Sequence, residues 1–266
     1  MADQQKSIFV TGAGSGIGRA TPAIVCAEGL VRRPVRRERS GAAGNGRFPS
    51  QAAHFHGVRR TRPLRLGPRG QAFGQVTDRR MHVLFSNAGV SRGNWIEEMS
   101  EDDIDLVIDV NLKGVLHGVR AAALPLLRET AGARIVNTAS VAGVFAPPRM
   151  AVYAATKFGV RALTESLDVE FSRYGVRVVS LMPWFMDTPI LNNVGGGEGS
   201  NRALRDQLVE NKTPIYPVEM AAERAWDAAH GDAIHYMVGK EAERARFAAQ
   251  FFNAMRNRLK QMLGDD

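Results

Sequence analysis

The stretch SIFVTGAGSGIG, at residues 7–18, constrains the fold more than any other part of the chain. A short apolar pattern that suits a strand leads into a turn with Gly12, Gly16 and Gly18, and the residues after the turn can begin a helix. Glycines allow a tight turn and a close approach of the backbone to a pyrophosphate, while a helix N-terminus offers free N–H groups. Taken alone, the pattern fits a plain strand-to-helix turn equally well.

Further strands and helices are expected to alternate after residue 80. Apolar runs at 82–89, 134–140 and 176–183 predict buried strands, and they are separated by long helical patterns at 100–129 and 152–175. Strands that alternate with helices are typical of a parallel sheet covered on both faces. The sequence therefore predicts an α/β fold with a doubly wound, Rossmann-type parallel sheet, and its length of 266 residues fits a single domain.

Polar residues that could do chemistry follow these predicted strands. Tyr153 and Lys157 lie four positions apart on a predicted helix, so they share a face. Ser140 ends the preceding strand, and ligands in such sheets bind beyond the carboxyl ends of the strands. Asn111 stands inside a predicted helix, where an amide is unfavourable unless it is exposed or hydrogen-bonded. A surface tyrosine–lysine pair would be the alternative if Tyr153 and Lys157 stood alone.

The set resembles the short-chain dehydrogenase/reductase family. The matching elements are TGAGSGIG (11–18), NAG (87–89), Asn111, Ser140, YAATK (153–157), and Pro183 with Thr188. The resemblance covers residues 1–21 and about 81–240. It implies an oxidoreductase that transfers a hydride between a nicotinamide cofactor and the carbinol or carbonyl carbon of an alcohol or ketone. A non-catalytic nucleotide-binding protein of the same fold is the alternative.

The resemblance also implies a role for each catalytic residue. Tyr153 would be the acid/base, and Lys157 would lower its pKa and hold the nicotinamide ribose. Ser140 would bind the substrate oxygen, and Asn111 would position a water linked to Lys157. The cofactor contacts would come from Gly12, Ser15, Gly16, Ile17, Gly18, Asn87, Ala88, Gly89, Tyr153, Lys157, Pro183 and Thr188.

Two residues depart from the family pattern. Ser86 stands where the family usually has asparagine, a change that a turn should tolerate. Trp184 stands where it usually has glycine, and its ring would either narrow the substrate pocket or pack under the following loop. Residues 189–215 occupy the position of the family's mobile substrate lid.

Residues 31–80 do not match the family. They hold thirteen arginines against two acidic residues, whereas the whole chain carries a net charge of +8. At face value, Arg36, Arg37 and Arg39 would hold the 2′-phosphate of NADP. Because an excess of arginine, proline and glycine is typical of a GC-rich gene read out of frame, we tested a one-base shift.

The shifted frame permits LLLFARRGWFVGLYDVNEAGL for residues 22–42, which places an aspartate at the position of Arg36. We therefore hypothesise that residues from about 22 to about 75 are a frame-shifted translation. A carboxylate at that strand end accepts from ribose hydroxyls and repels a 2′-phosphate. The hypothesis predicts NAD as the cofactor, with NADP as the alternative.

Several other classes of protein are disfavoured. The basic charge is confined to the anomalous segment, so we expect no nucleic-acid partner. No metal site is expected, because His54 and His56 have no acidic or cysteine partners nearby, and Cys26 is the only cysteine. No apolar run approaches the roughly 18 residues of a membrane helix. We expect a cytoplasmic protein that acts on a small molecule, and the resemblance implies a homo-oligomer, either a tetramer or a dimer.

Overall fold

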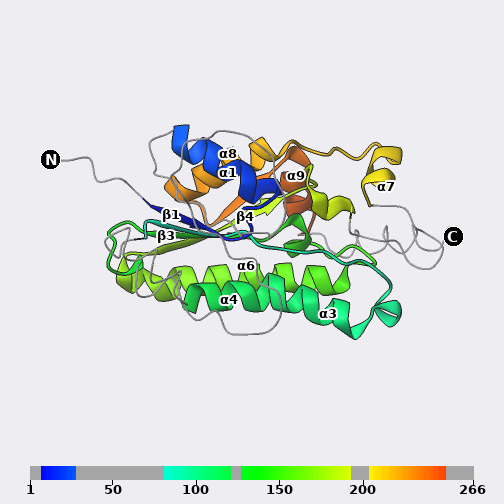
Figure 1. Cartoon of the computed structure of the whole chain (residues 1–266), viewed down its shortest axis with the longest axis horizontal. Coiled ribbons are helices and arrows are strands. Elements are labelled where there is room, and N and C mark those ends of the chain that lie inside the picture. The colour runs from blue at the N-terminus through cyan, green and yellow to red at the C-terminus, as the bar shows by residue number, and fades with distance from the viewer. Residues whose placement is uncertain (1–6, 28–80, 121–126, 193–203, 250–266) are drawn as a thin grey trace, which may run out of the picture.

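The computed structural model describes residues 7–27, 81–120, 127–192 and 204–249, and its centre is a parallel sheet of five strands (Figure 1). The strands lie side by side in chain order, β1 next to β2 and so on to β5. They are β1 (Ile8–Val10), β2 (Val83–Ser86), β3 (Arg134–Thr138), β4 (Arg177–Pro183) and β5 (His235–Val238). The parallel sheet expected from the sequence is confirmed.

Helices cover both faces of this sheet (Figure 1). On one face lie α1 (Gly16–Ala27) and α8 (Val218–His230), and on the other lie α3 (Glu101–Ile108), α4 (Gly114–Gly118) and α6 (Ala151–Phe171). Each face has its own buried core, because neighbouring residues of a strand point to opposite faces: Leu84 belongs to the α6 side and Phe85 to the α8 side. The doubly wound architecture is confirmed.

The segment expected to be one long helix from residue 100 is interrupted. It begins as expected, since the Ser100 hydroxyl accepts a hydrogen bond of 3.2 Å from the Asp103 N–H. A π-helical turn, η2 (Asp109–Lys113), then separates α3 from α4 and contains Asn111. The helix expected around Asn111 is therefore confirmed, but the sequence pattern did not predict the π-helical turn within it. Such turns admit an extra residue into the helix and are frequent at functional sites.

The helix α6 follows the predicted pattern closely. Val160, Leu167 and Phe171 are buried, as the helical spacing predicts. The regular helix ends at Phe171 and continues as a short 3-10 turn, whereas the sequence pattern extended it to Gly175. The remaining elements are η1 (Ile96–Glu98), η4 (Val141–Gly143), η5 (Ser172–Tyr174), η6 (Pro189–Asn192), α7 (Leu204–Glu210) and α9 (Lys240–Ala248).

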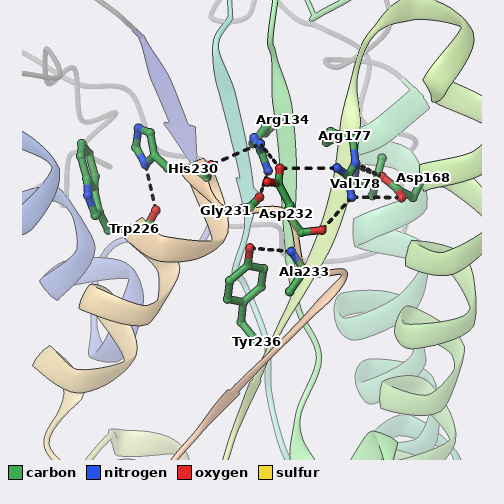
Figure 2. A network of polar contacts seen from close by, with 10 residues as sticks. All are labelled: Arg134, Asp168, Arg177, Val178, Trp226, His230, Gly231, Asp232, Ala233 and Tyr236. Atoms are coloured by element: carbon green, nitrogen blue, oxygen red, sulfur yellow. Dashed lines mark hydrogen bonds and ion pairs between the residues drawn. The ribbon is translucent and has the colours of Figure 1, made fainter.

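The amino ends of β3, β4 and β5 are joined by a polar network (Figure 2). Arg134, the first residue of β3, donates to the carbonyl oxygens of His230 and Gly231 in the turn before β5. Arg177, the first residue of β4, is paired with the Asp168 carboxylate of α6, with 2.9 Å between Nε and Oδ1. The same carboxylate accepts from the Val178 N–H at 2.8 Å. This edge of the sheet is therefore fixed by polar contacts to both layers of helices.

Most of the anomalous segment lies outside the described residues, as do Arg36, Arg37, Arg39 and both histidines of the HFH sequence. The frame-shift hypothesis and the single-domain prediction therefore stay predictions. Among the described helices, none is long and apolar enough to cross a membrane.

Candidate active site

The turns that follow β1 and β2 are tied together at the carboxyl edge of the sheet. The Thr11 hydroxyl accepts hydrogen bonds from the N–H groups of Asn87, at 2.9 Å, and Ala88, at 3.0 Å. The Asn87 side-chain amide donates in return to the Thr11 carbonyl at 3.2 Å. These bonds hold the predicted nucleotide turn directly against the NAG segment.

The glycines of the first turn make room that any side chain would fill. Gly12 has a φ of +70°, and a Cβ atom there would lie 2.7 Å from the Ala88 Cα. Gly16 has a φ of +51°, and a Cβ atom there would lie 2.9 Å from the Thr188 Cγ2. A positive φ is readily adopted only by glycine. The start of α1 therefore lies in close contact with Thr188, which follows β4 in the chain.

A buried hydroxyl without a partner lies beside this turn. Thr188 is 9% exposed, and its Oγ1 atom has no hydrogen-bond partner among residues 7–27, 81–120, 127–192 and 204–249. A buried hydroxyl left unpaired is unfavourable by about 1 to 3 kcal/mol, so it marks a position where a ligand group would be stabilised. The glycine turn and the N-terminus of α1 suit a pyrophosphate group, and the Thr188 hydroxyl beside them could bind a further polar group of the same ligand.

Tyr153 lies in the first turn of α6 and meets Ser140 from the end of β3. The Ser140 side chain lies near enough to the Tyr153 hydroxyl to act on its pKa. The Ser140 oxygen also accepts from the Ala142 N–H at 3.1 Å, which fixes its position at the start of η4. Burial raises the pKa of the Tyr153 hydroxyl, and Ser140 lowers it by a smaller amount. Tyr153 is therefore neutral and poised as a proton donor near neutral pH.

Lys157 lies one helical turn after Tyr153 and is almost completely buried, with 3% of its surface exposed. Its Nζ donates to the Thr138 carbonyl at 2.9 Å and lies 5.5 Å from the centroid of the Tyr153 ring. Burial lowers the pKa of Lys157 to about 8. The resemblance implied that this ammonium lowers the Tyr153 pKa, whereas in this structure burial raises the pKa of Tyr153 and lowers that of Lys157, and Ser140 is the group that lowers the pKa of Tyr153.

Asn111 is fully buried in the π turn and anchors the loop after β2. Its Nδ2 donates to the Val90 carbonyl at 2.9 Å and to the Thr156 hydroxyl at 3.3 Å, while its Oδ1 accepts from the Val90 N–H at 2.9 Å. A Cβ atom at Gly89 would lie 3.4 Å from Asn111 Oδ1 and 3.7 Å from Lys157 Nζ. Asn111 and Lys157 thus flank the same glycine, and the sequence-based grouping of these residues matches their positions.

The two departures from the family pattern have different surroundings. Trp184 packs against the core cluster on the α6 face, edge-on to Phe185 with ring centroids 5.1 Å apart. This packing favours the second of the two alternatives given for the ring, although its Nε1 is buried without a partner. The Ser86 hydroxyl is likewise buried and unpaired at the end of β2.

Of the predicted lid, η6, α7 and residues 211–215 are described, and Arg205 of α7 is paired with Asp187.

Sequence reasoning missed the residues that hold the site residues in place. Thr11 binds the NAG segment, and Thr138 binds Lys157. Both threonines stand where a predicted strand ends, and this position could have indicated that they lie near the site. Thr156 and the backbone of Val90 complete the surroundings of Asn111. Nothing in the local sequence indicated the π turn. In the described part of the chain, no three histidine, cysteine or acidic residues are grouped as metal ligands.

Comparison with known proteins gives a consistent result. The family model described as short chain dehydrogenase matches residues 6–199. The chain is 34% identical over 196 residues to the (3R)-3-hydroxyacyl-CoA dehydrogenase of Canis lupus familiaris, covering 70% of this chain and 76% of that protein.

Two crystal structures of short chain dehydrogenases have the same fold. One, from Burkholderia phymatum in complex with NAD, is 25% identical with a TM-score of 0.69, covering 96% of this chain and 97% of that one. The other, from Burkholderia cenocepacia in complex with NADP, is 22% identical with a TM-score of 0.72, covering 97% of this chain and 99% of that one.

Proposed function

This chain belongs to the short-chain dehydrogenase family and is a nicotinamide-dependent oxidoreductase acting on an alcohol or ketone, and from that premise we propose that Tyr153, Ser140 and Lys157 carry out its chemistry. The observation that carries the proposal is the contact of Ser140 with Tyr153, with the buried Lys157 one helical turn away. The fold alone would not require these three groups to meet.

In the direction of ketone reduction, the bound nicotinamide supplies the hydride that forms the new C–H bond at the carbonyl carbon. Tyr153 gives its hydroxyl proton to the carbonyl oxygen, so one hydride and one proton convert the ketone into an alcohol. Ser140 donates a hydrogen bond to the same oxygen as negative charge develops on it. In alcohol oxidation, the same groups act in reverse, with Tyr153 as the base.

Lys157 has two roles in this proposal. Its ammonium stabilises the phenolate left on Tyr153 and donates to the nicotinamide ribose. Asn111 supports both residues by fixing Val90 and Thr156 around Gly89. Asn111 would also position a water molecule that is linked to Lys157.

The cofactor would be held by the turn of residues 12–18, the NAG segment, the end of β4 and Thr188. The choice between NAD and NADP depends on residues from about 22 to about 75, whose sequence is in question. On the basis of the shifted frame, we propose NAD. NADP remains the alternative, from the arginines as written. We also propose a cytoplasmic homo-oligomer, to be checked by size-exclusion chromatography with light scattering.

The test is turnover of a panel of secondary alcohols and ketones with NAD and with NADP, followed by the absorbance of the reduced nicotinamide. With a cofactor deuterated at the transferring position, we expect deuterium at the carbinol carbon of the product. Calorimetric binding of cofactor without turnover of any panel member would favour the non-catalytic alternative. The intact mass of the protein decides whether the sequence as written is the one made.

A further inference from the structure

A second basic group lies at the carboxyl edge of the sheet and has no part in the proposed chemistry. Arg149 precedes Met150, the N-cap of α6, and stands four residues before Tyr153. Its guanidinium carbon lies 5.2 Å from the ring centroid of Trp95, which belongs to the loop after β2. The pair therefore joins the loops that follow β2 and β3, the same loops that position Asn111 and Ser140.

Arg149 is held in place but not neutralised. Its Nε is buried and makes no hydrogen bond, the side chain as a whole is partly exposed, and within the described residues no carboxylate lies at ion-pair distance. Another arginine of the loop after β2 is different, because Arg92 is paired with Asp103 at 3.0 Å. Arg149 thus presents a guanidinium that stacks on Trp95 and whose buried Nε–H lacks an acceptor among the described residues.

The backbone at this position is also unusual. Arg149 has a φ of +63°, one of two positive values among the described residues other than glycine. A left-handed conformation is unfavourable for a residue with a Cβ atom, and such outliers often stand at ligand-binding positions. A strained backbone and an unpaired cation at one residue are difficult to explain by stability alone, because glycine would remove both.

From these contacts we infer that Arg149 is a specificity residue that binds an anionic group of the substrate, either a carboxylate or a phosphate. This inference rests on the proposed function, since it describes the other end of the molecule that reacts at Tyr153. A planar guanidinium matches the geometry of both anions, and stacking on Trp95 limits its motion. A neutral substrate would leave the guanidinium N–H groups unpaired, so the site discriminates against it.

The experiment compares matched substrates that differ in charge. Straight-chain hydroxy acids of increasing length are assayed against their methyl esters, and hydroxyalkyl phosphates against the corresponding neutral diols. We expect at least one anion to exceed its neutral partner in kcat/KM by about tenfold or more, mainly through KM. The series that shows the preference identifies the anion. Equal use of both members throughout both series, or turnover of the neutral members alone, would overturn the inference.

Variants of Arg149 separate recognition from structure. Arg149→Met keeps the apolar stem beside Trp95 and should erase the preference for the anion while leaving kcat/KM for the neutral partner within about twofold. Arg149→Lys should retain part of the preference. Arg149→Gly should erase it and also raise the melting temperature, because glycine adopts a positive φ freely. Equal losses on charged and neutral substrates in Arg149→Met would contradict recognition of an anion.

A matched control exists at the other end of α6. Arg173 also stacks on an aromatic ring, that of Tyr174, at 4.8 Å, and Arg173→Met should change neither substrate series. Tyr153→Phe should abolish turnover of both members of every pair. If the parent protein turns over neither these series nor any member of the panel of secondary alcohols and ketones, the proposed function fails. Calorimetry with the same anions then decides the inference by itself: binding that is lost in Arg149→Met supports it, and no binding overturns it.

Discussion

The two edges of the same sheet are built in opposite ways. At the amino edge, Arg134 and Arg177 are fully engaged with carboxylates and carbonyl groups of the neighbouring helix and turn (Figure 2). At the carboxyl edge, Thr188, Trp184 and Arg149 each have a buried polar atom that finds no partner in the part of the chain that the structure describes. The buried ammonium of Lys157 and the positive φ of Arg149 are also found there.

The contrast indicates which edge is built for stability and which for function. Satisfied polar networks stabilise a fold, whereas unpaired polar groups and strained backbone destabilise it and persist where a ligand completes them. Substitutions at the amino edge should therefore lower stability and spare activity. Substitutions at the carboxyl edge should lower activity and spare, or even increase, stability.

Apart from the loss of the Tyr153 hydroxyl, the largest expected effect is that of Lys157→Met. We expect kcat/KM to fall by about a thousandfold, because the variant lacks the charge that stabilises the Tyr153 phenolate. At neutral pH the variant should be more stable than the parent. Because the pKa of Lys157 is lowered from 10.5 to about 8, burial of its charged form destabilises the folded parent by about 3 kcal/mol. The variant avoids this cost but lacks the hydrogen bond to the Thr138 carbonyl, which offsets about 1 kcal/mol of the gain.

Chemical denaturation at several pH values checks the sign of this effect. Between pH 8 and 10.5 the unfolded parent binds more protons than the folded parent, so the stability of the parent rises with pH in that window. The advantage of Lys157→Met should thus be full below pH 8 and vanish at higher pH. A variant that is active and less stable at pH 7 would contradict the assignment of Lys157 to the functional edge.

The next effect in size is that of Asp168→Ala at the amino edge. The change removes the ion pair with Arg177 and leaves the Val178 N–H without its acceptor. We expect a loss of about 2 to 3 kcal/mol in the free energy of unfolding, with kcat/KM per folded molecule unchanged within about twofold. The matched control is Glu170→Ala on the same helix, whose exposed side chain is bonded only to Ser166, and it should change stability by less than about 0.5 kcal/mol.

The sequence predicts those parts of this contrast that depend on local patterns, and it does not predict those that depend on contacts between distant segments. The positions of β2, β3, β4 and α6 follow from local apolar periodicity, and Tyr153 and Lys157 share a face because helical spacing requires it. Ser140 could be placed with them since strand ends in a parallel sheet meet at one edge. These features depend on few residues at a time.

The remaining features depend on packing between distant segments. The π turn around Asn111 exists because its amide bonds the backbone of Val90, a contact that no local pattern encodes. The high pKa of Tyr153 and the low pKa of Lys157 come from burial, which is a property of the assembled layers. The strain at Arg149 and its stacking on Trp95 are likewise visible only in three dimensions.

A smaller effect is expected from pH. Tyr153 stays protonated up to high pH because burial raises its pKa, whereas Lys157 loses its proton near pH 8. For ketone reduction, kcat/KM should be constant below pH 8 and fall about tenfold per pH unit above it. In Lys157→Arg any remaining activity should lack this decline, because a guanidinium keeps its charge. If kcat/KM of the parent stays constant up to pH 10, the charge of Lys157 has no part in the reaction.

The smallest effect is expected from Thr188→Val. The hydroxyl has no partner among the described residues, so its removal should leave the melting temperature unchanged or slightly higher. Loss of one hydrogen bond to the nicotinamide amide should weaken cofactor binding about fivefold, measured by calorimetry. Thr164→Val is the comparison, because that buried hydroxyl donates to the Val160 carbonyl and accepts from Asn137. It should reduce stability without changing cofactor affinity.

The most direct test of the central claim is steady-state kinetics of Tyr153→Phe together with its melting temperature. Removing one hydroxyl at the functional edge should lower kcat/KM by about a thousandfold or more for every substrate, since it removes the proton donor. The melting temperature should stay within about two degrees of the parent, because Ser140 is the one side chain among the described residues that acts on the Tyr153 hydroxyl besides burial. A Tyr153→Phe protein that is folded and as active as the parent would contradict the account.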